Sequence, residues 1–179
     1  MNNFIVFNDE KTDIKAINQL TPHTSFQESC IAFIEDWTNG NEAFLQHTSG
    51  STGKPKLIEI TRPQMMASAM MTIKALDLPP YKNSFLCLSP DYIAGKMMIV
   101  RSLMNNMNIV AAEPAVSPII NKNYQIHFAA FTPMQMLEIV SKEESKMILS
   151  QFEKIILGGG EVSIQLKNTR STWVRINGK

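Results

Sequence analysis

The run of ten residues at positions 47–56 constrains this chain more than any other segment. Its sequence is His-Thr-Ser-Gly-Ser-Thr-Gly-Lys-Pro-Lys, with four hydroxyl side chains, two glycines and two lysines. The flanking segments 43–46 and 57–60 are rich in apolar residues and are predicted to be strands. A plain hairpin needs only about two turn residues. The sequence therefore predicts two strands joined by a long loop of specialised composition.

The composition of this loop indicates an anion-binding site. Hydroxyls and backbone N–H groups donate hydrogen bonds, glycines allow close approach of the backbone, and lysines supply positive charge. The candidate phosphate-binding residues are Thr48, Ser49, Gly50, Ser51, Thr52, Gly53, Lys54 and Lys56. An ordinary Gly/Ser turn is the alternative for the loop, and a solvated surface lysine is the alternative for Lys54. His47, as a lone histidine, is expected to be a packing side chain.

The loop does not fit the Walker A pattern, which requires G-x-x-x-x-G-K-[ST] and opens a helix. Gly50 and Gly53 are too close together, and Pro55 follows Lys54 where a hydroxyl residue is required. Pro55 also disfavours a helix that begins inside the loop. A kinase-like phosphate site is therefore the weaker alternative.

Length and composition limit the other possibilities. The chain has 179 residues, 44% of them apolar, and a net charge of +1, which fits one domain and gives no basic excess for nucleic acid. No apolar stretch is long enough for a membrane span, and the N-terminus lacks the basic region of a signal peptide. Cys30 and Cys87 are isolated in apolar segments, as expected for reduced thiols of a cytoplasmic protein. No ligand spacing for a structural metal site is present.

Segments of strand and helix character alternate along the chain, with short connections. Strands are predicted at 4–7, 84–88, 109–112, 126–131 and 154–157, besides the two beside the loop. Helices are predicted from Ser25, where Ser25 to Glu28 form a capping-box pattern, and at 62–78, 92–107, 133–141 and 143–150. This alternation predicts an α/β fold with a mostly parallel sheet and helices on both faces. The loops at 48–56, 90–95, 132–135 and 158–163 follow strands, so they are expected to meet at one crevice.

The segment from Thr48 to Lys56 resembles the phosphate-binding signature of the adenylate-forming enzymes, the superfamily of acyl-CoA synthetases and AMP-binding ligases. The resemblance extends roughly from Phe44 to Ser163. Within that superfamily, the Leu-Gly-Gly-Gly-Glu-Val-Ser segment at 157–163 is most similar to the o-succinylbenzoate–CoA ligases of menaquinone biosynthesis. The resemblance implies that the chain is part of the large N-terminal domain of such an enzyme.

This resemblance implies a reaction and its cofactors. A carboxylic acid, here 2-succinylbenzoate, would be joined to the α-phosphate of ATP with loss of pyrophosphate and then transferred to coenzyme A, with Mg²⁺ as the metal. The loop would embrace the β- and γ-phosphates: Thr48, Ser49, Ser51 and Thr52 as donors, Lys56 as a charge. Both reactants are anions, so such a site must screen charge and align them.

The resemblance also places an acyl and adenine pocket beside the loop. The segment 91–96 resembles the family segment that begins the helix beside that pocket, with Tyr92 in place of the usual histidine. Lys96 is the candidate partner for a second substrate carboxylate, with a solvated helix charge as the alternative. Thr132 is also explained as a helix cap, and the glycines are also explained as a turn after a strand. The residues assigned to this pocket are Tyr92, Gly95, Lys96, Thr132, Gly158, Gly159, Gly160 and Glu161.

Several motifs of the superfamily are absent from the 179 residues. These are the Tyr-Gly-x-Thr-Glu segment that holds magnesium, the Thr-Gly-Asp segment that binds ribose, and the C-terminal domain with its catalytic lysine. Residues 1–179 are therefore expected to form one partial domain that does not make acyl-adenylate by itself. We expect the isolated chain to self-associate or to need the missing segment to complete its sheet. A non-catalytic nucleotide- or phosphate-binding module remains the alternative function.

Overall fold

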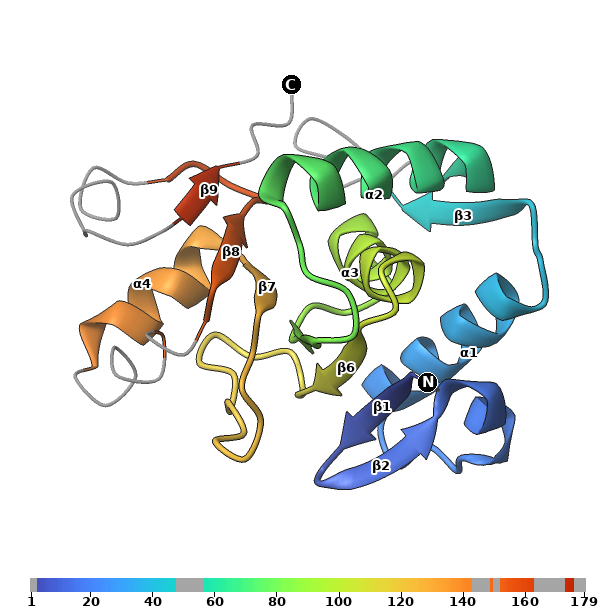
Figure 1. Ribbon diagram of the computed structural model, residues 1–179, viewed down its shortest axis with the longest axis horizontal. Coiled ribbons are helices and arrows are strands. Elements are labelled where there is room, and N and C mark those ends of the chain that lie inside the picture. Colours follow the sequence, from blue (N-terminus) through green and yellow to red (C-terminus); the bar gives the residue numbers. More distant parts are fainter. Residues whose placement is uncertain (1–2, 48–56, 143–148, 150–151, 163–172, 176–179) are drawn as a thin grey trace.

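The centre of the molecule is a seven-stranded sheet with the strand order β2-β1-β6-β5-β7-β8-β9. A computed structural model describes residues 3–47, 57–142, 149, 152–162 and 173–175 (Figure 1). β1 and β2 are antiparallel, and the other neighbouring strands are parallel, which confirms the predicted mostly parallel sheet. The strands are β1 (Phe4–Phe7), β2 (Glu10–Asp13), β5 (Asn83–Leu86), β6 (Asn108–Ala111), β7 (Phe128–Phe131), β8 (Lys154–Leu157) and β9 (Trp173–Arg175).

Helices cover both faces of this sheet, as predicted. Alternate strand residues enter two different apolar clusters, because successive side chains of a strand point to opposite faces. On one face Leu86 and Ile156 join a cluster formed with α1 (Ser25–Thr38), α2 (Arg62–Leu76) and α3 (Ile93–Met104). On the other face Phe85 and Ile155 join the cluster of α4 (Pro133–Ser141). α2 packs on α3 and lies farther from the sheet (Figure 1).

The two strands beside the loop form a sheet of their own, which the sequence did not predict. β3 (Ala43–His47) pairs only with β4 (Leu57–Thr61) among the described residues, and the pairing is antiparallel. The physical reason is visible in β3, where Phe44 and Gln46 are buried and Leu45 is exposed. Such alternation suits a hairpin with one face on the protein and one in solvent, whereas the central β7 is buried at every position.

Aromatic side chains fasten the start of this hairpin to the end of α1. The ring of Phe44 stacks on Trp37 with 5.5 Å between centroids and meets Phe33 edge-on at 5.3 Å. The guanidinium of Arg62 lies 4.1 Å from the centre of the Trp37 ring and donates to the Trp37 carbonyl oxygen at 2.6 Å. The two-stranded sheet is therefore held by side chains and not by strand pairing with the main sheet.

Two helices begin with the same sequence device, which the Thr-x-Pro and Thr-Pro patterns predicted. Thr61 and Thr132 cap α2 and α4, and each hydroxyl accepts a hydrogen bond from the backbone N–H of the glutamine three residues later. The glutamine side chain accepts from the backbone N–H of the capping threonine, which completes a capping box. A proline in the first turn follows each threonine, where its missing N–H costs nothing.

Other predicted boundaries need correction. α1 is capped by Thr24, one residue before the predicted Ser25, because the Thr24 hydroxyl accepts from the Gln27 N–H at 3.2 Å, and the Gln27 side chain accepts from the His23 N–H at 2.8 Å. α2 ends at Leu76, before the predicted Leu78, because Asp77 adopts a left-handed conformation. α3 ends at Met104 and not at Met107, since Asn105 and Asn106 leave the helix.

Three elements were not predicted, and one predicted helix is not covered. β2 and the 3-10 helix η1 (Ile14–Gln19) are too polar or too short to show a clear period, and β9 has three residues. The helix predicted at 143–150 falls almost entirely outside the described residues. None of the helices in the described ranges has the length and apolar character needed to span a bilayer.

Candidate functional site

Three neighbouring strands end side by side at one edge of the main sheet. β5, β7 and β8 are parallel, and they end at Leu86, Phe131 and Leu157. The Gly158 N–H donates to the Phe131 carbonyl oxygen at 3.2 Å, which extends the pairing one residue beyond β8. The segments that follow these strands carry Tyr92, Thr132 and the glycines from Gly158 onward, so the structure brings three of the four predicted loops to this edge.

The glycines after β8 differ in what surrounds them. Gly159 has a φ of +80°, a conformation that L side chains rarely adopt, and this explains a glycine at that position. A Cβ at Gly160 would contact the Pro133 ring at 3.6 Å, whereas a Cβ at Gly158 would meet no atom of the described residues within 4 Å. Glu161 is exposed and Val162 is buried. Open space beside Gly158 is consistent with a bound group at this edge.

The N-terminus of α4 contributes Thr132 and a buried glutamine to the same edge. The Thr132 hydroxyl accepts from the Gln135 N–H at 3.2 Å, so it acts as a helix cap. The Gln135 side chain is 5% exposed, and its Nε2 donates to the carbonyl oxygens of Ala115 at 2.9 Å and Cys87 at 3.3 Å. Gln135 therefore links the end of β5, the start of α4 and the segment after β6.

The turn between β5 and α3 contributes Tyr92 and Gly95. Tyr92 is 61% exposed and stands before the first residue of α3 without a side-chain cap. Gly95 is buried, and a Cβ there would lie 2.2 Å from the carbonyl oxygen of Ser89. A contact that short cannot exist, so Gly95 allows α3 to pack directly on the turn that carries Tyr92.

Lys96 lies where α3 meets the end of β3. Its Nζ donates to the carbonyl oxygen of Leu45 at 2.8 Å and to Oε1 of Gln46 at 3.1 Å. Partial burial lowers the pKa of Lys96, and the charges of Asp91 and Asp36 oppose that effect. Two of the three ammonium donors are thus directed to β3.

The predicted phosphate-binding residues 48–56 lie outside the described residues. Their attachment is nevertheless defined, because β3 ends at His47 and β4 begins at Leu57, and these two residues are paired. The two strands predicted on either side of residues 48–56 are therefore confirmed. The Nε2 of Gln46 donates to the carbonyl oxygen of Asp91 at 2.8 Å, which holds the end of β3 beside the segment that follows β5.

Gln46 was missed in the sequence-based prediction. It is 3% exposed and stands two residues after the buried Phe44, at an inward position of the strand. An amide at a position that the alternation assigns to the interior is the signal that identifies it, because burial of an amide is unfavourable without hydrogen-bond partners.

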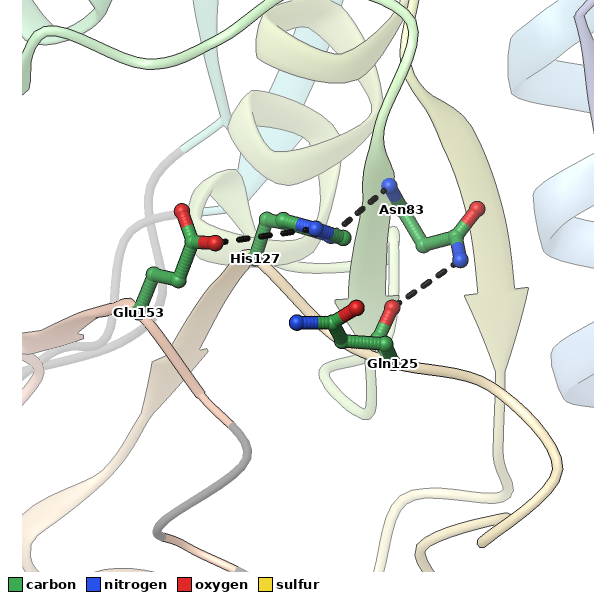
Figure 2. Close-up of polar contacts among 4 residues, drawn as sticks. All are labelled: Asn83, Gln125, His127 and Glu153. Carbon is green, nitrogen blue, oxygen red and sulfur yellow. Dashed lines mark hydrogen bonds and ion pairs between the residues drawn. The ribbon is translucent and has the colours of Figure 1, made fainter.

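A second polar cluster lies at the opposite edge of the sheet, where the strands begin. Figure 2 shows His127 between Asn83 and Glu153, with Gln125 accepting from the Asn83 amide at 2.9 Å. This cluster is separate from the candidate site. In the described ranges, no group of three or more His, Cys, Asp or Glu side chains can hold a metal ion.

Comparison with known proteins agrees with this geometry. The family model for AMP-binding enzymes matches residues 8–176. A crystal structure of an acyl-CoA synthetase (AMP-forming)/AMP-acid ligase II-like protein from Dyadobacter fermentans is 32% identical, with a TM-score of 0.80 over 94% of this chain and 50% of that protein. The o-succinylbenzoate coenzyme A synthetase of Bacillus subtilis, in complex with AMP, shares the fold at 20% identity and a TM-score of 0.55, over 68% of this chain and 26% of that one.

Among curated proteins, a 2-succinylbenzoate–CoA ligase of Listeria monocytogenes is 28% identical over 74% of this chain. The chain spans 29% of the length of that ligase. The family match covers nearly all of the residues given, and on that basis the chain belongs to the AMP-binding enzyme family.

Proposed function

We propose that the protein carrying this chain is an adenylate-forming acid–CoA ligase that activates a carboxylic acid with ATP and transfers it to coenzyme A. The observation that supports this most directly is the convergence at the carboxyl edge of β5, β7 and β8, with the end of β3 fastened beside them by Gln46. Ligands of open parallel sheets bind at this edge. Residues 1–179 would form part of one domain of this enzyme.

The proposal gives each group of site residues a role. The hydroxyls of Thr48, Ser49, Ser51 and Thr52 and the charges of Lys54 and Lys56 bind the ATP phosphates, and Gly50 and Gly53 allow the close approach. Removing two hydroxyls or a lysine from such a cradle leaves phosphate charge without its partners.

A flat acyl or adenine group is proposed to lie over Gly158, where an added Cβ would meet no atom of the described residues within 4 Å. Exposed Tyr92 and Glu161 are proposed to border this space, and Thr132, Gly159 and Gly160 to shape the segments around it. Gly95 contributes by letting α3 reach the turn. These assignments make the carboxyl edge the place where acid and nucleotide meet.

The acid is proposed to be 2-succinylbenzoate, which would place the protein in menaquinone biosynthesis. The support is the name of the Listeria ligase, together with structural similarity to the Bacillus subtilis synthetase solved with ATP and a magnesium ion. The resemblance assigns the protein ligand of Mg²⁺ to the Tyr-Gly-x-Thr-Glu segment of the superfamily, which the 179 residues do not contain.

The test is ATP–pyrophosphate exchange by the complete protein with 2-succinylbenzoate, in wild type and in the double variant Thr48→Ala, Lys56→Ala. We expect exchange in the wild type and a dissociation constant for ATP at least about tenfold higher in the variant, because charged hydrogen bonds to phosphate are lost. Lys74→Ala, at an exposed position of α2, is the matched control.

Different failures have different meanings. Unchanged ATP affinity in the double variant would remove the loop from the site. ATP binding without exchange for any acid would favour the alternative of a non-catalytic nucleotide-binding module. Exchange with other acids but not with 2-succinylbenzoate would reject only the proposed substrate.

Exposed apolar side chains also lead us to propose that the isolated chain self-associates or is covered by further chain. Leu45 and Leu57 on the hairpin are 58% and 54% exposed, and Met71 on α2 is 73% exposed. Light scattering of the isolated chain and of Leu45→Ser, Leu57→Ser tests this. We expect a larger species for the wild type than for the variant, and a wild-type monomer would contradict the proposal.

A further inference from the structure

The end of β3 is held by an unusual buried amide. Gln46 is 3% exposed, and both ends of its side chain have partners: Nε2 donates to the Asp91 carbonyl oxygen and Oε1 accepts from Lys96. An apolar residue at this inward position would avoid the desolvation penalty of the amide. A buried amide with partners at both ends fixes direction and register more than it adds stability.

Lys96 completes the junction from the side of α3. Its Nζ contacts both the Leu45 carbonyl oxygen at 2.8 Å and Oε1 of Gln46 at 3.1 Å, so one ammonium joins consecutive residues of β3 to the helix. The centre of the Phe33 ring lies 5.9 Å from Nζ. Two of the ammonium's hydrogen bonds are therefore directed to β3.

Asp91 anchors the junction to the remainder of the fold. Its carboxylate accepts from the hydroxyls of Ser29 at 2.8 Å and Ser89 at 2.9 Å, so its backbone is fixed relative to α1 and to the turn after β5. The carbonyl oxygen that receives the Gln46 amide belongs to this fixed residue. These bonds therefore fix the position of β3 relative to the carboxyl edge of the main sheet.

We propose that Gln46 and Lys96 are positioning residues for ATP, which set where the chain leaves β3 relative to the carboxyl edge of the main sheet. The hairpin has no strand pairing to the main sheet within the described ranges, so this junction helps to hold it there, together with the aromatic contacts of Phe44 and the packing of α2 on α3. Phe44 acts at the start of β3, and the junction acts at the end that leads to residue 48. The inference rests on the proposed function, and it gives Lys96 a role other than pairing with a substrate carboxylate.

The test uses the complete protein and the variants Gln46→Leu, Lys96→Met, the double variant and Lys96→Arg. The ATP dissociation constant is measured by calorimetry without acid, and the KM for the acid is measured by pyrophosphate exchange. We expect the ATP dissociation constant to rise about tenfold in each single variant, with the KM for the acid changed less than about twofold. The double variant should be no weaker than either single one, and Lys96→Arg should restore most of the affinity.

Controls separate positioning from general damage. Lys74→Met removes an exposed charge from α2 and should leave ATP affinity unchanged. Unchanged ATP affinity in Gln46→Leu and Lys96→Met would overturn the inference. A rise confined to the KM for the acid in Lys96→Met would also overturn it and would assign Lys96 to a substrate carboxylate.

A further measurement keeps the inference separate from the proposed function. If the wild-type protein does not bind ATP, the proposed function fails, and hydrogen exchange of the β3 amides then judges the junction alone. Exchange at least about tenfold faster in Gln46→Leu than in Lys74→Met, with equal global stability, would support the junction. Equal exchange in the two variants would reject it.

Discussion

The Nε2 atom of His127 lies 3.7 Å from Oε1 of Glu153, at the amino ends of β7 and β8 (Figure 2). The Nδ1 atom of the same ring accepts from the backbone N–H of Asn83 at 3.4 Å. This contact requires an unprotonated Nδ1, which places the ring proton on Nε2, toward Glu153. The His127 side chain is 7% exposed and that of Glu153 is 45% exposed. The contact with the Asn83 N–H is therefore expected to contribute more to stability than the contact with Glu153.

We predict that His127→Phe lowers the free energy of unfolding by about 2 kcal/mol, because the Asn83 N–H loses its acceptor in a part-buried position. Glu153→Gln should change it by less than about 0.5 kcal/mol, since a half-exposed charge is screened by solvent. Urea denaturation at neutral pH measures both. Equal losses in the two variants would show that the charge pair, and not the backbone contact, dominates.

Gly95 and Gly158 form a second matched pair. Gly95→Ala should cost about 3 kcal/mol, because its Cβ would lie 2.2 Å from the Ser89 carbonyl oxygen and α3 must shift. Gly158→Ala should leave stability within about 0.5 kcal/mol, since no atom in the described ranges lies within 4 Å of the added methyl group. Thermal unfolding measures the difference.

Gly158→Ala, which should hardly affect stability, is expected to affect activity. Under the proposed function, Gly158→Ala in the complete protein should raise the KM for the acid or for ATP, because the methyl group enters the space assigned to the ligand. An unchanged KM for both would remove Gly158 from the binding site and leave its structural description intact.

Comparison of two capping glutamines, Gln64 and Gln135, measures how much the interior contacts of Gln135 add to stability. Gln64 and Gln135 make the same capping box, but Gln64 is exposed and Gln135 is 5% exposed with two further acceptors, Cys87 and Ala115. Gln64→Ala should cost about 0.5–1 kcal/mol, the usual value of a cap. Gln135→Ala should cost about 2–3 kcal/mol, because two carbonyl groups lose a donor. Similar losses in urea denaturation would mean that the contacts beyond the cap add little.

The two buried thiols make stability depend on alkaline pH. Burial raises the pKa of Cys87, against a smaller opposing effect of its contact with Gln135, and burial also raises the pKa of Cys30, with Glu113 and Asp91 acting in the same direction. A thiol ionises in the unfolded chain near pH ~8.5, while these thiols remain protonated in the folded chain. The unfolded state then binds fewer protons, so the free energy of unfolding falls as the pH rises above about 8.5.

Between about pH 7.5 and 9.5 we expect each thiol to remove about 1.4 kcal/mol of stability. The double variant Cys30→Ala, Cys87→Ala should lose this part of the slope, whatever its stability at neutral pH. Urea denaturation across that range, in a reducing buffer, measures it. Parallel pH profiles for wild type and variant would show that the thiols ionise in the folded protein.

The sequence predicted the parts of the fold whose signals are local. The helix cap expected at Thr132 and the strand predicted at 154–157 are both observed. Gly40 has a φ of +85°, and its N–H donates to the Trp37 carbonyl oxygen, as expected at the end of a helix. Such features depend on a few neighbouring residues, so one sequence is enough to find them.

The parts that failed depend on contacts between distant residues. Nothing near β3 in the sequence indicates that, among the described residues, it pairs only with β4 and packs on Trp37 of α1. The pairing of Lys96 with a substrate carboxylate remains a prediction, and the sequence did not indicate its contacts with Leu45 and Gln46, about fifty residues earlier in the chain. The hydroxyl-rich loop remains a prediction from composition, since residues 48–56 are outside the described ranges.

The separate hairpin also affects how this chain tolerates changes in length. In a parallel sheet, an insertion or deletion within a strand shifts every following side chain to the opposite face. In the described part of the chain β3 and β4 pair only with each other, in a register that runs from Ala43–Thr61 to His47–Leu57. This register does not involve any strand of the main sheet. A change in length between His47 and Leu57 would therefore leave the alignment of β5, β6, β7 and β8 unaltered, so any constraint on the length of this segment comes from the proposed ATP site and not from the core.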